Sequence, residues 1–127
     1  MTKVLIIGIG GFIGSVFRYL LSGFVQGISK SISFPYGTFA VNIVGCFLIG
    51  FFAHLSETRA VLTESSRSFV IIGLLGGFTT FSAFSNETFN LLRDGETSLA
   101  FLNIIGQVVI CLGAVWCGRA VAYWIWR

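Results

Sequence analysis

The chain has few charged residues, one proline and one histidine. Of its 127 residues, 10% are charged and 55% are hydrophobic, whereas a soluble domain carries about 25% charged residues. So few charges cannot cover a protein surface in water, which excludes an ordinary soluble domain and indicates a lipid environment. The eight basic residues are scattered and form no stripe, which argues against a nucleic-acid-binding surface.

Acidic residues are missing from the start of the chain, and Glu57 is the first of them. Gly8, Gly11 and Gly14 have the spacing of a phosphate-binding loop, but a dinucleotide fold places an acidic residue about 20 positions further on. The missing acid therefore argues against a dinucleotide site. With a single histidine, no paired carboxylates and no nucleophile–base pair, the sequence holds no catalytic constellation, and we do not expect an enzyme.

The three cysteines, Cys46, Cys111 and Cys117, all lie in apolar segments. Their number is odd, and no Cys-x-x-Cys motif or nearby histidine completes a metal site. Free cysteines usually behave as small buried hydrophobic side chains, and we expect the same of these three.

Four apolar stretches take up most of the chain. A helix needs about 20 apolar residues to cross the hydrocarbon core of a bilayer, and each stretch comes near that length. Because the connections are short, no soluble domain fits between the stretches. The sequence therefore predicts an all-α, multi-pass protein of the cell (inner) membrane, one four-helix transmembrane domain over residues 1–127 with spans at about 4–24, 37–55, 69–92 and 99–118.

The distribution of basic residues gives only a weak orientation signal. Four spans put both termini on one side of the membrane. That side carries Lys3, Arg59, Arg67, Arg119 and Arg127, and the other side carries Arg18, Lys30 and Arg93. Orientation in the membrane follows the bias in Lys and Arg. So small a bias is compatible with insertion of the chain in both orientations. The alternative is ordinary insertion in one orientation, with both termini in the cytoplasm.

Glycines are abundant, with 16 in the chain. Gly10 with Gly14, and Gly73 with Gly77, are spaced as Gly-x-x-x-Gly, a motif that lets helix backbones approach closely in lipid. The spacing predicts tight helix packing. Four helices enclose little space, so a second copy of the chain is a candidate partner for this packing.

The third span contains an unusual polar stretch from Gly73 to Glu87, with Gly76-Gly77-Phe78-Thr79-Thr80-Phe81-Ser82 at its centre. Paired glycines weaken a helix, and hydroxyls can bond to the backbone instead. A break here would free carbonyls at membrane depth, which is tolerated only inside protein or beside a water-filled cavity. An unbroken helix with a small-residue packing face is the alternative, and composition leaves the two open.

Aromatic and polar side chains in the spans have a possible use in anion passage. Phe81 and Phe84 are three residues apart, so both rings can share a helix face, and their positive edges can face a small anion. In the second span, the side-chain amide of Asn42 offers N–H donors that suit an anion. Thr38 lies one helical turn before it. In the fourth span the residues Asn103, Gln107 and Cys111 form a polar stripe at helical spacing.

Two ionisable residues, Arg18 and Glu87, lie within spans. Each would cost a few kcal/mol at the centre of the bilayer. Both lie toward span ends, where a water-filled vestibule lowers that cost.

These residues resemble the Fluc-type fluoride channel family (CrcB-like proteins). The matching motifs are Gly10-Gly11-x-x-Gly14 with Arg18-Tyr19, Gly37-Thr38-x-x-x-Asn42-x-x-Gly45, and Gly76-Gly77-x-Thr79-Thr80-Phe81-Ser82-x-Phe84-Ser85-x-Glu87. The third motif is highly specific, and the resemblance covers almost the whole chain. The fourth span departs from it, because Asn103 and Gln107 stand where the family usually shows a tyrosine and serines.

The resemblance implies an antiparallel, dual-topology homodimer in which the third helix is broken. Fluoride would leave the cytoplasm passively through pores along the dimer interface, which lowers the toxicity of fluoride inside the cell. The resemblance implies a structural sodium ion held by the backbone carbonyls of Gly76 and Thr79. It also implies a fluoride pore lined by Asn42, Phe81 and Phe84. To the same pore we assign the polar side chains Thr38, Ser82, Ser85 and Gln107, although Gln107 stands where the sequence departs from the family, and we place Arg18 and Glu87 in a vestibule because both lie toward span ends.

Two other functions remain alternatives at this point. Small multidrug exporters are also short, four-helix dimers, but their proton coupling needs a glutamate in the first helix. That helix here has no acid and carries Arg18, so Glu87 is the one candidate. An assembly subunit without transport would explain the glycines, but not the Thr-Thr-Phe-Ser-x-Phe-Ser block.

Overall fold

The computed structural model describes residues 1–58 and 62–126, and this part of the chain is helical, without strands. Arg59 and Arg127, used in the orientation argument, lie outside the described residues. Four helical segments are long and apolar enough to cross a membrane, which confirms the predicted class. They are α1 (Thr2–Ser29), α2 (Tyr36–Thr58), a composite third segment, and α6 (Thr97–Ile125).

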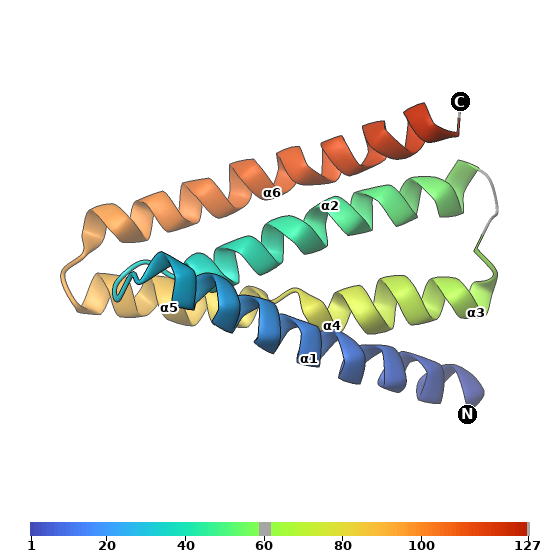
Figure 1. Cartoon of the computed structure of the whole chain (residues 1–127), viewed down its shortest axis with the longest axis horizontal. Coiled ribbons are helices and arrows are strands. Elements are labelled where there is room, and N and C mark those ends of the chain that lie inside the picture. Colours follow the sequence, from blue (N-terminus) through green and yellow to red (C-terminus); the bar gives the residue numbers. More distant parts are fainter. Residues whose placement is uncertain (59–61, 127) are drawn as a thin grey trace.

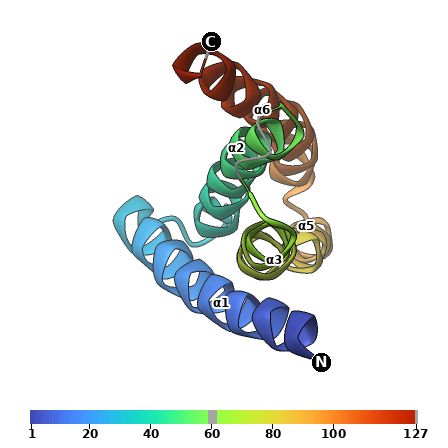
Figure 2. The same ribbon diagram turned by 90° about the vertical axis from the view of Figure 1, so that its right-hand side faces the viewer.

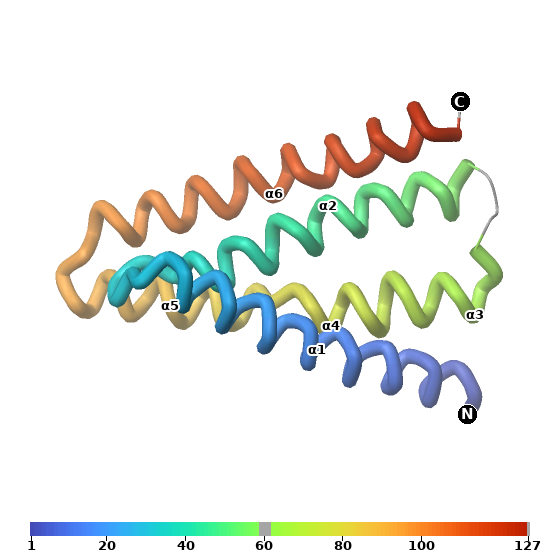
Figure 3. Tube along the Cα trace, viewed as in Figure 1, coloured from blue at the N-terminus to red at the C-terminus, as the bar shows by residue number. Residues whose placement is uncertain are grey.

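The third segment is made of four pieces rather than one helix. It consists of α3 (Glu64–Arg67), the π-helical η1 (Ser68–Leu75), α4 (Gly76–Phe78) and α5 (Phe81–Arg93). The tube in Figure 3 follows the chain through the interruption between α4 and α5. The break that the sequence left open is therefore present, and the unbroken helix is wrong.

The helices extend beyond the apolar stretches read from the sequence. The α1 helix has 28 residues and, at about 1.5 Å per residue, exceeds the ~30 Å hydrocarbon core. It ends where Lys30 takes a left-handed conformation, with φ at 51°, and α2 begins directly after Pro35. Backbone conformation, not loss of hydrophobicity, sets these ends.

The helices form an open bundle whose two chain ends lie together. In Figure 1 the N-terminus, the end of α2, the start of α3 and the end of α6 lie at one end of the bundle, and the α1–α2 and α5–α6 connections lie at the other. The helices α2 and α6 run side by side in the same direction. Seen end-on in Figure 2, α1 and α6 lie on opposite sides, with α2 and the third segment between them.

The two Gly-x-x-x-Gly pairs pack against each other within the chain. A Cβ atom on Gly14 would lie 2.0 Å from the carbonyl oxygen of Leu74, and one on Gly77 would lie 2.5 Å from that of Gly11. These distances are far below any real contact, so α1 and the third segment touch backbone to backbone. Each pair has its partner inside the chain.

Candidate functional site

The centre of the site is the interruption of the third segment at Thr79 and Thr80. Both residues are extended, with ψ angles of 156° at Thr79 and 112° at Thr80. The helix resumes at Phe81 because Thr80 caps it, its Oγ1 accepting a hydrogen bond of 3.2 Å from the N–H of Ala83. A threonine in this role satisfies one of the N–H groups that every helix start leaves free.

Asn42 of α2 holds the extended backbone in place. Its Oδ1 accepts a hydrogen bond of 2.9 Å from the N–H of Thr80, and its Nδ2 donates at 3.2 Å to the Thr80 carbonyl. The same Nδ2 donates at 3.2 Å to Oε1 of Gln107 on α6. Both amide hydrogens of Asn42 are thus used within the chain, so binding an anion there requires exchanging one of these bonds.

The break frees two particular carbonyl groups. In a continuous α-helix, the N–H of residue i bonds to the carbonyl of residue i−4. The N–H of Thr80 would bond to Gly76, but it donates to Asn42. The N–H of Ala83 would bond to Thr79, but it donates to the Thr80 hydroxyl. The carbonyls of Gly76 and Thr79 therefore lose the partners that a continuous helix would give them.

One side of the break opens into a largely apolar cavity of about 370 Å³, called here the aromatic cavity. The rings of Phe81 and Phe84 lie 5.3 Å apart, centroid to centroid, at its wall. Phe84 is buried, whereas Phe81 is 77% exposed on the single chain. The residues that line this cavity are Asn42, Cys46, Thr79, Thr80, Phe81, Phe84, Gln107, Val108, Cys111, Leu112 and Val115.

The other side opens into a cavity of about 790 Å³, called here the Arg18 cavity. Arg18 and Glu87 both line it, and within the described part of the chain Arg18 forms no ion pair. Its charge is therefore available to an anion in the cavity. The remaining lining residues are Ser15, Tyr19, Ser22, Gly23, Gln26, Thr38, Thr80, Ser82 and Ala83.

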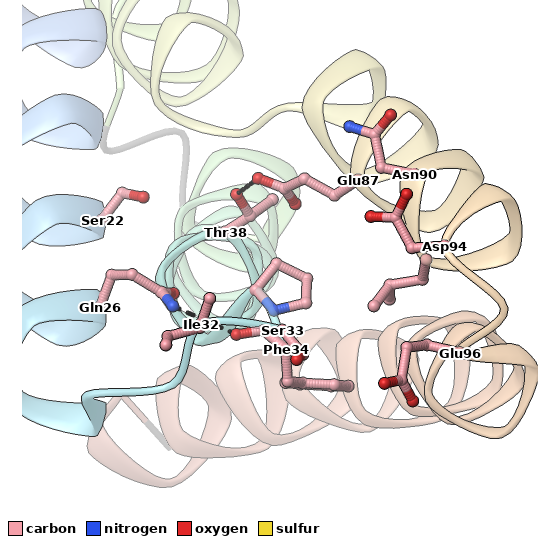
Figure 4. A pocket seen from close by; sticks show the side chains of 12 residues that line it. Ser22, Gln26, Ile32, Ser33, Phe34, Thr38, Glu87, Asn90, Asp94 and Glu96 are labelled. Atoms are coloured by element: carbon pink, nitrogen blue, oxygen red, sulfur yellow. Dashed lines mark hydrogen bonds between the residues drawn. The ribbon is translucent and has the colours of Figure 1, made fainter.

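A third, acidic cavity of about 460 Å³ adjoins the Arg18 cavity, and Glu87 lines both. The Oε1 atom of Glu87 accepts a 2.6 Å hydrogen bond from the Thr38 hydroxyl, while its buried Oε2 has no partner among the described residues. Figure 4 shows Glu87, Asn90, Asp94 and Glu96 around this third cavity. Three carboxylates repel anions, so the acidic cavity is a poor route for them.

The structure gathers most of the residues predicted for the site around the break. Thr80 lines both the aromatic and the Arg18 cavity, so the two meet at this residue. Ser85 is the exception, because it is exposed, donates to the Phe81 carbonyl at 2.9 Å and lines neither cavity. Asn103 is fully buried and donates at 2.9 Å to the hydroxyl of Thr88, away from the break.

Sequence reasoning missed the part played by Thr80 and Cys46. Thr80 stands between a break and a new helix, where a threonine is a usual capping residue, and that position is the sequence signal for its role. Cys46 lies four residues, about one helical turn, after Asn42. That spacing places both residues on the same helix face and therefore indicates that Cys46 lines the same cavity.

Comparisons with known proteins match this chain over nearly its full length. Residues 5–119 match the family described as CrcB-like protein, Camphor Resistance (CrcB). The fluoride-specific ion channel FluC of Opitutus terrae is 50% identical over 96% of this chain and 93% of its own length. The protein of the same name in Geotalea daltonii is 48% identical over 98% of this chain and 100% of its own length. The chain therefore belongs to the CrcB-like family.

Proposed function

We propose that this protein is a fluoride-selective channel that lets fluoride leave the cytoplasm passively. The observation that carries the proposal is the meeting of the Arg18 cavity and the aromatic cavity at Thr80, beside the clamped helix break. Relatives named as fluoride-specific channels, 48–50% identical over nearly the whole chain, support it. No relative reported above is a multidrug exporter.

The proposed path begins in the Arg18 cavity, where the guanidinium of Arg18, which forms no ion pair within the described residues, attracts a small anion. It continues past Thr80 to Asn42, Gln107 and the two phenylalanine rings. The buried Gln107 Nε2, which has no partner in the described part of the chain, is a donor that an anion could use. Aromatic edges and single amides are weak, successive sites, which let an ion bind and still leave.

A second copy of the chain, inserted in the opposite sense, would complete the path. Phe81 is 77% exposed on one chain although it lines the aromatic cavity. The two freed carbonyls of one chain are too few for a cation site, whereas two chains would supply four. The weak bias in basic residues is consistent with opposite insertion of two copies.

The same carbonyls, contributed by two chains, would fit a structural sodium ion. Carbonyl oxygens are hard ligands suited to a hard cation, and the break leaves Gly76 and Thr79 without their helical partners. A bound sodium ion would supply positive charge that compensates these carbonyls. The chain contributes the oxygens and the clamp of Asn42 that fixes them.

The role of the phenylalanines is tested with Phe81→Ile and Phe84→Ile in liposomes loaded with fluoride. Both variants are expected to fold and dimerise but to lose most fluoride efflux, because isoleucine has no positive ring edge. Phe89→Ile is the matched control, since Phe89 is on the same helix and 64% exposed but lines neither cavity. Normal efflux in both test variants would refute the pore assignment.

A further inference from the structure

Two cysteines from different helices lie in the wall of the aromatic cavity. Cys46 of α2 and Cys111 of α6 both line the cavity, and both are partly accessible. This differs from the expectation that the cysteines are simply buried hydrophobic side chains. The chain separates them widely, so their proximity depends on how α2 and α6 pack.

The register of these two helices brings the cysteines face to face. Asn42 bonds to Gln107, a residue 65 positions further along. A Cβ on Gly50 would lie 2.2 Å from the carbonyl oxygen of Val115, and these two residues are also 65 positions apart in the sequence. Since α2 and α6 run in the same direction (Figure 1), the turn between these two contacts pairs Cys46 with Cys111. Both side chains line the same cavity, so the pair lies where α2 and α6 meet at its wall.

The surroundings of the pair favour a soft metal ion as its ligand. The Cys111 thiol donates at 3.7 Å to Oε1 of Gln107, and the residues lining the cavity include no acidic, basic or histidine side chain. Hard cations prefer oxygen-rich sites, whereas sulfur ligands select soft ions. An apolar cavity also penalises any net charge that remains after binding.

We propose that Cys46 and Cys111 form a two-thiolate site for a soft divalent cation such as Hg²⁺, and that the bound ion closes the aromatic cavity. On binding, two S–H bonds break, two sulfur–mercury bonds form, and two protons pass to water. The product carries no net charge, because two thiolates cancel the charge of the ion. Only the claim that the bound ion stops fluoride rests on the proposed channel function.

Cys117 provides a control within the same chain. It is exposed and lies on α6, six residues after Cys111, which places it roughly 120° around the helix from the cavity face. It lacks a second cysteine at the spacing that pairs α2 with α6. A mercury ion on Cys117 would therefore hold one thiolate and a solvent ligand.

The binding test uses the Cys117→Ser protein, titrated with Hg²⁺ and weighed intact by mass spectrometry. One mercury ion per chain is expected. The ion should remain bound through a wash with dilute free cysteine, and it should protect both thiols from reaction with a maleimide. Adding Cys46→Ser or Cys111→Ser should make mercury removable by the same wash. Two mercury ions per chain, or equal retention by paired and single thiols, would overturn the site.

The flux test compares fluoride efflux from liposomes before and after Hg²⁺, each variant normalised to its own starting rate. The Cys117→Ser protein should lose nearly all its efflux, and the Cys46→Ser/Cys111→Ser protein should keep it. Mercury binding to the pair without loss of efflux would overturn the proposed closure. Absence of efflux before mercury would instead contradict the channel function, while the binding test still decides the site.

Discussion

Replacing Asn42 with alanine tests the clamp that holds the helix break. The side chain makes three hydrogen bonds, two to the backbone of Thr80 and one to Gln107. Interhelical hydrogen bonds in membrane proteins contribute about 0.6 kcal/mol each, and about 1 kcal/mol is typical elsewhere. Losing all three should therefore lower the free energy of unfolding by about 2–3 kcal/mol from hydrogen bonding.

Asn103→Ala is the matched control for this change. Asn103 is the same residue type and is also buried, but it makes a single described hydrogen bond, to Thr88. Both substitutions remove the same side-chain atoms from a buried position, so the difference between them reports mainly on the hydrogen bonds. Asn103→Ala should cost about 1 kcal/mol from hydrogen bonding, leaving Asn42→Ala about 1–2 kcal/mol less stable.

The assay is denaturant unfolding of the purified protein in mixed micelles, run with sodium and with a larger monovalent cation in its place. The wild type and Asn103→Ala should be more stable in sodium, because the clamp fixes the Gly76 and Thr79 carbonyls. Asn42→Ala should lose this preference. Equal stability of the two variants, with the sodium preference intact in both, would refute the reasoning.

Three further predictions concern packing, electrostatics and insertion. Gly14→Ala should prevent folding, because its Cβ would lie 2.0 Å from the Leu74 carbonyl, whereas Gly8→Ala, with nothing within 4 Å, should be tolerated; yields of monodisperse protein compare the two. Arg18→Gln should lower fluoride efflux most at low ionic strength, since salt screens the lost attraction; an unchanged salt dependence would contradict a vestibule role. A tag at the C-terminus should be accessible to protease from both sides of the native membrane, and one-sided access would exclude dual topology.

Hydropathy correctly predicted four long apolar helices, because a membrane span must satisfy its backbone internally and present apolar side chains to lipid. The helix break was recognised from a specific motif, whereas composition alone left it open. The π-helical turn of η1 had no sequence signal. The ends of the helices were also missed, since a helix can continue past the hydrocarbon core until a residue such as Lys30 changes its backbone conformation.

The site was harder to read than the fold, because its contacts depend on the register between helices. The sequence presented Asn42 as a donor for an anion, but its amide is already bonded to Thr80 and Gln107. The Cys46–Cys111 pair was invisible for the same reason, since no local pattern records how α2 lies against α6. By contrast, the Gly-x-x-x-Gly spacing correctly indicated close packing, although the structure finds both partners in one chain.

The most direct test of the central claim is passive anion efflux from liposomes that hold the purified wild-type protein. Fluoride and chloride are measured separately, with and without a proton gradient. We predict fast fluoride loss and almost no chloride loss, both independent of the proton gradient. Absence of fluoride loss from a folded protein, or export of a cation that depends on the proton gradient, would contradict this prediction.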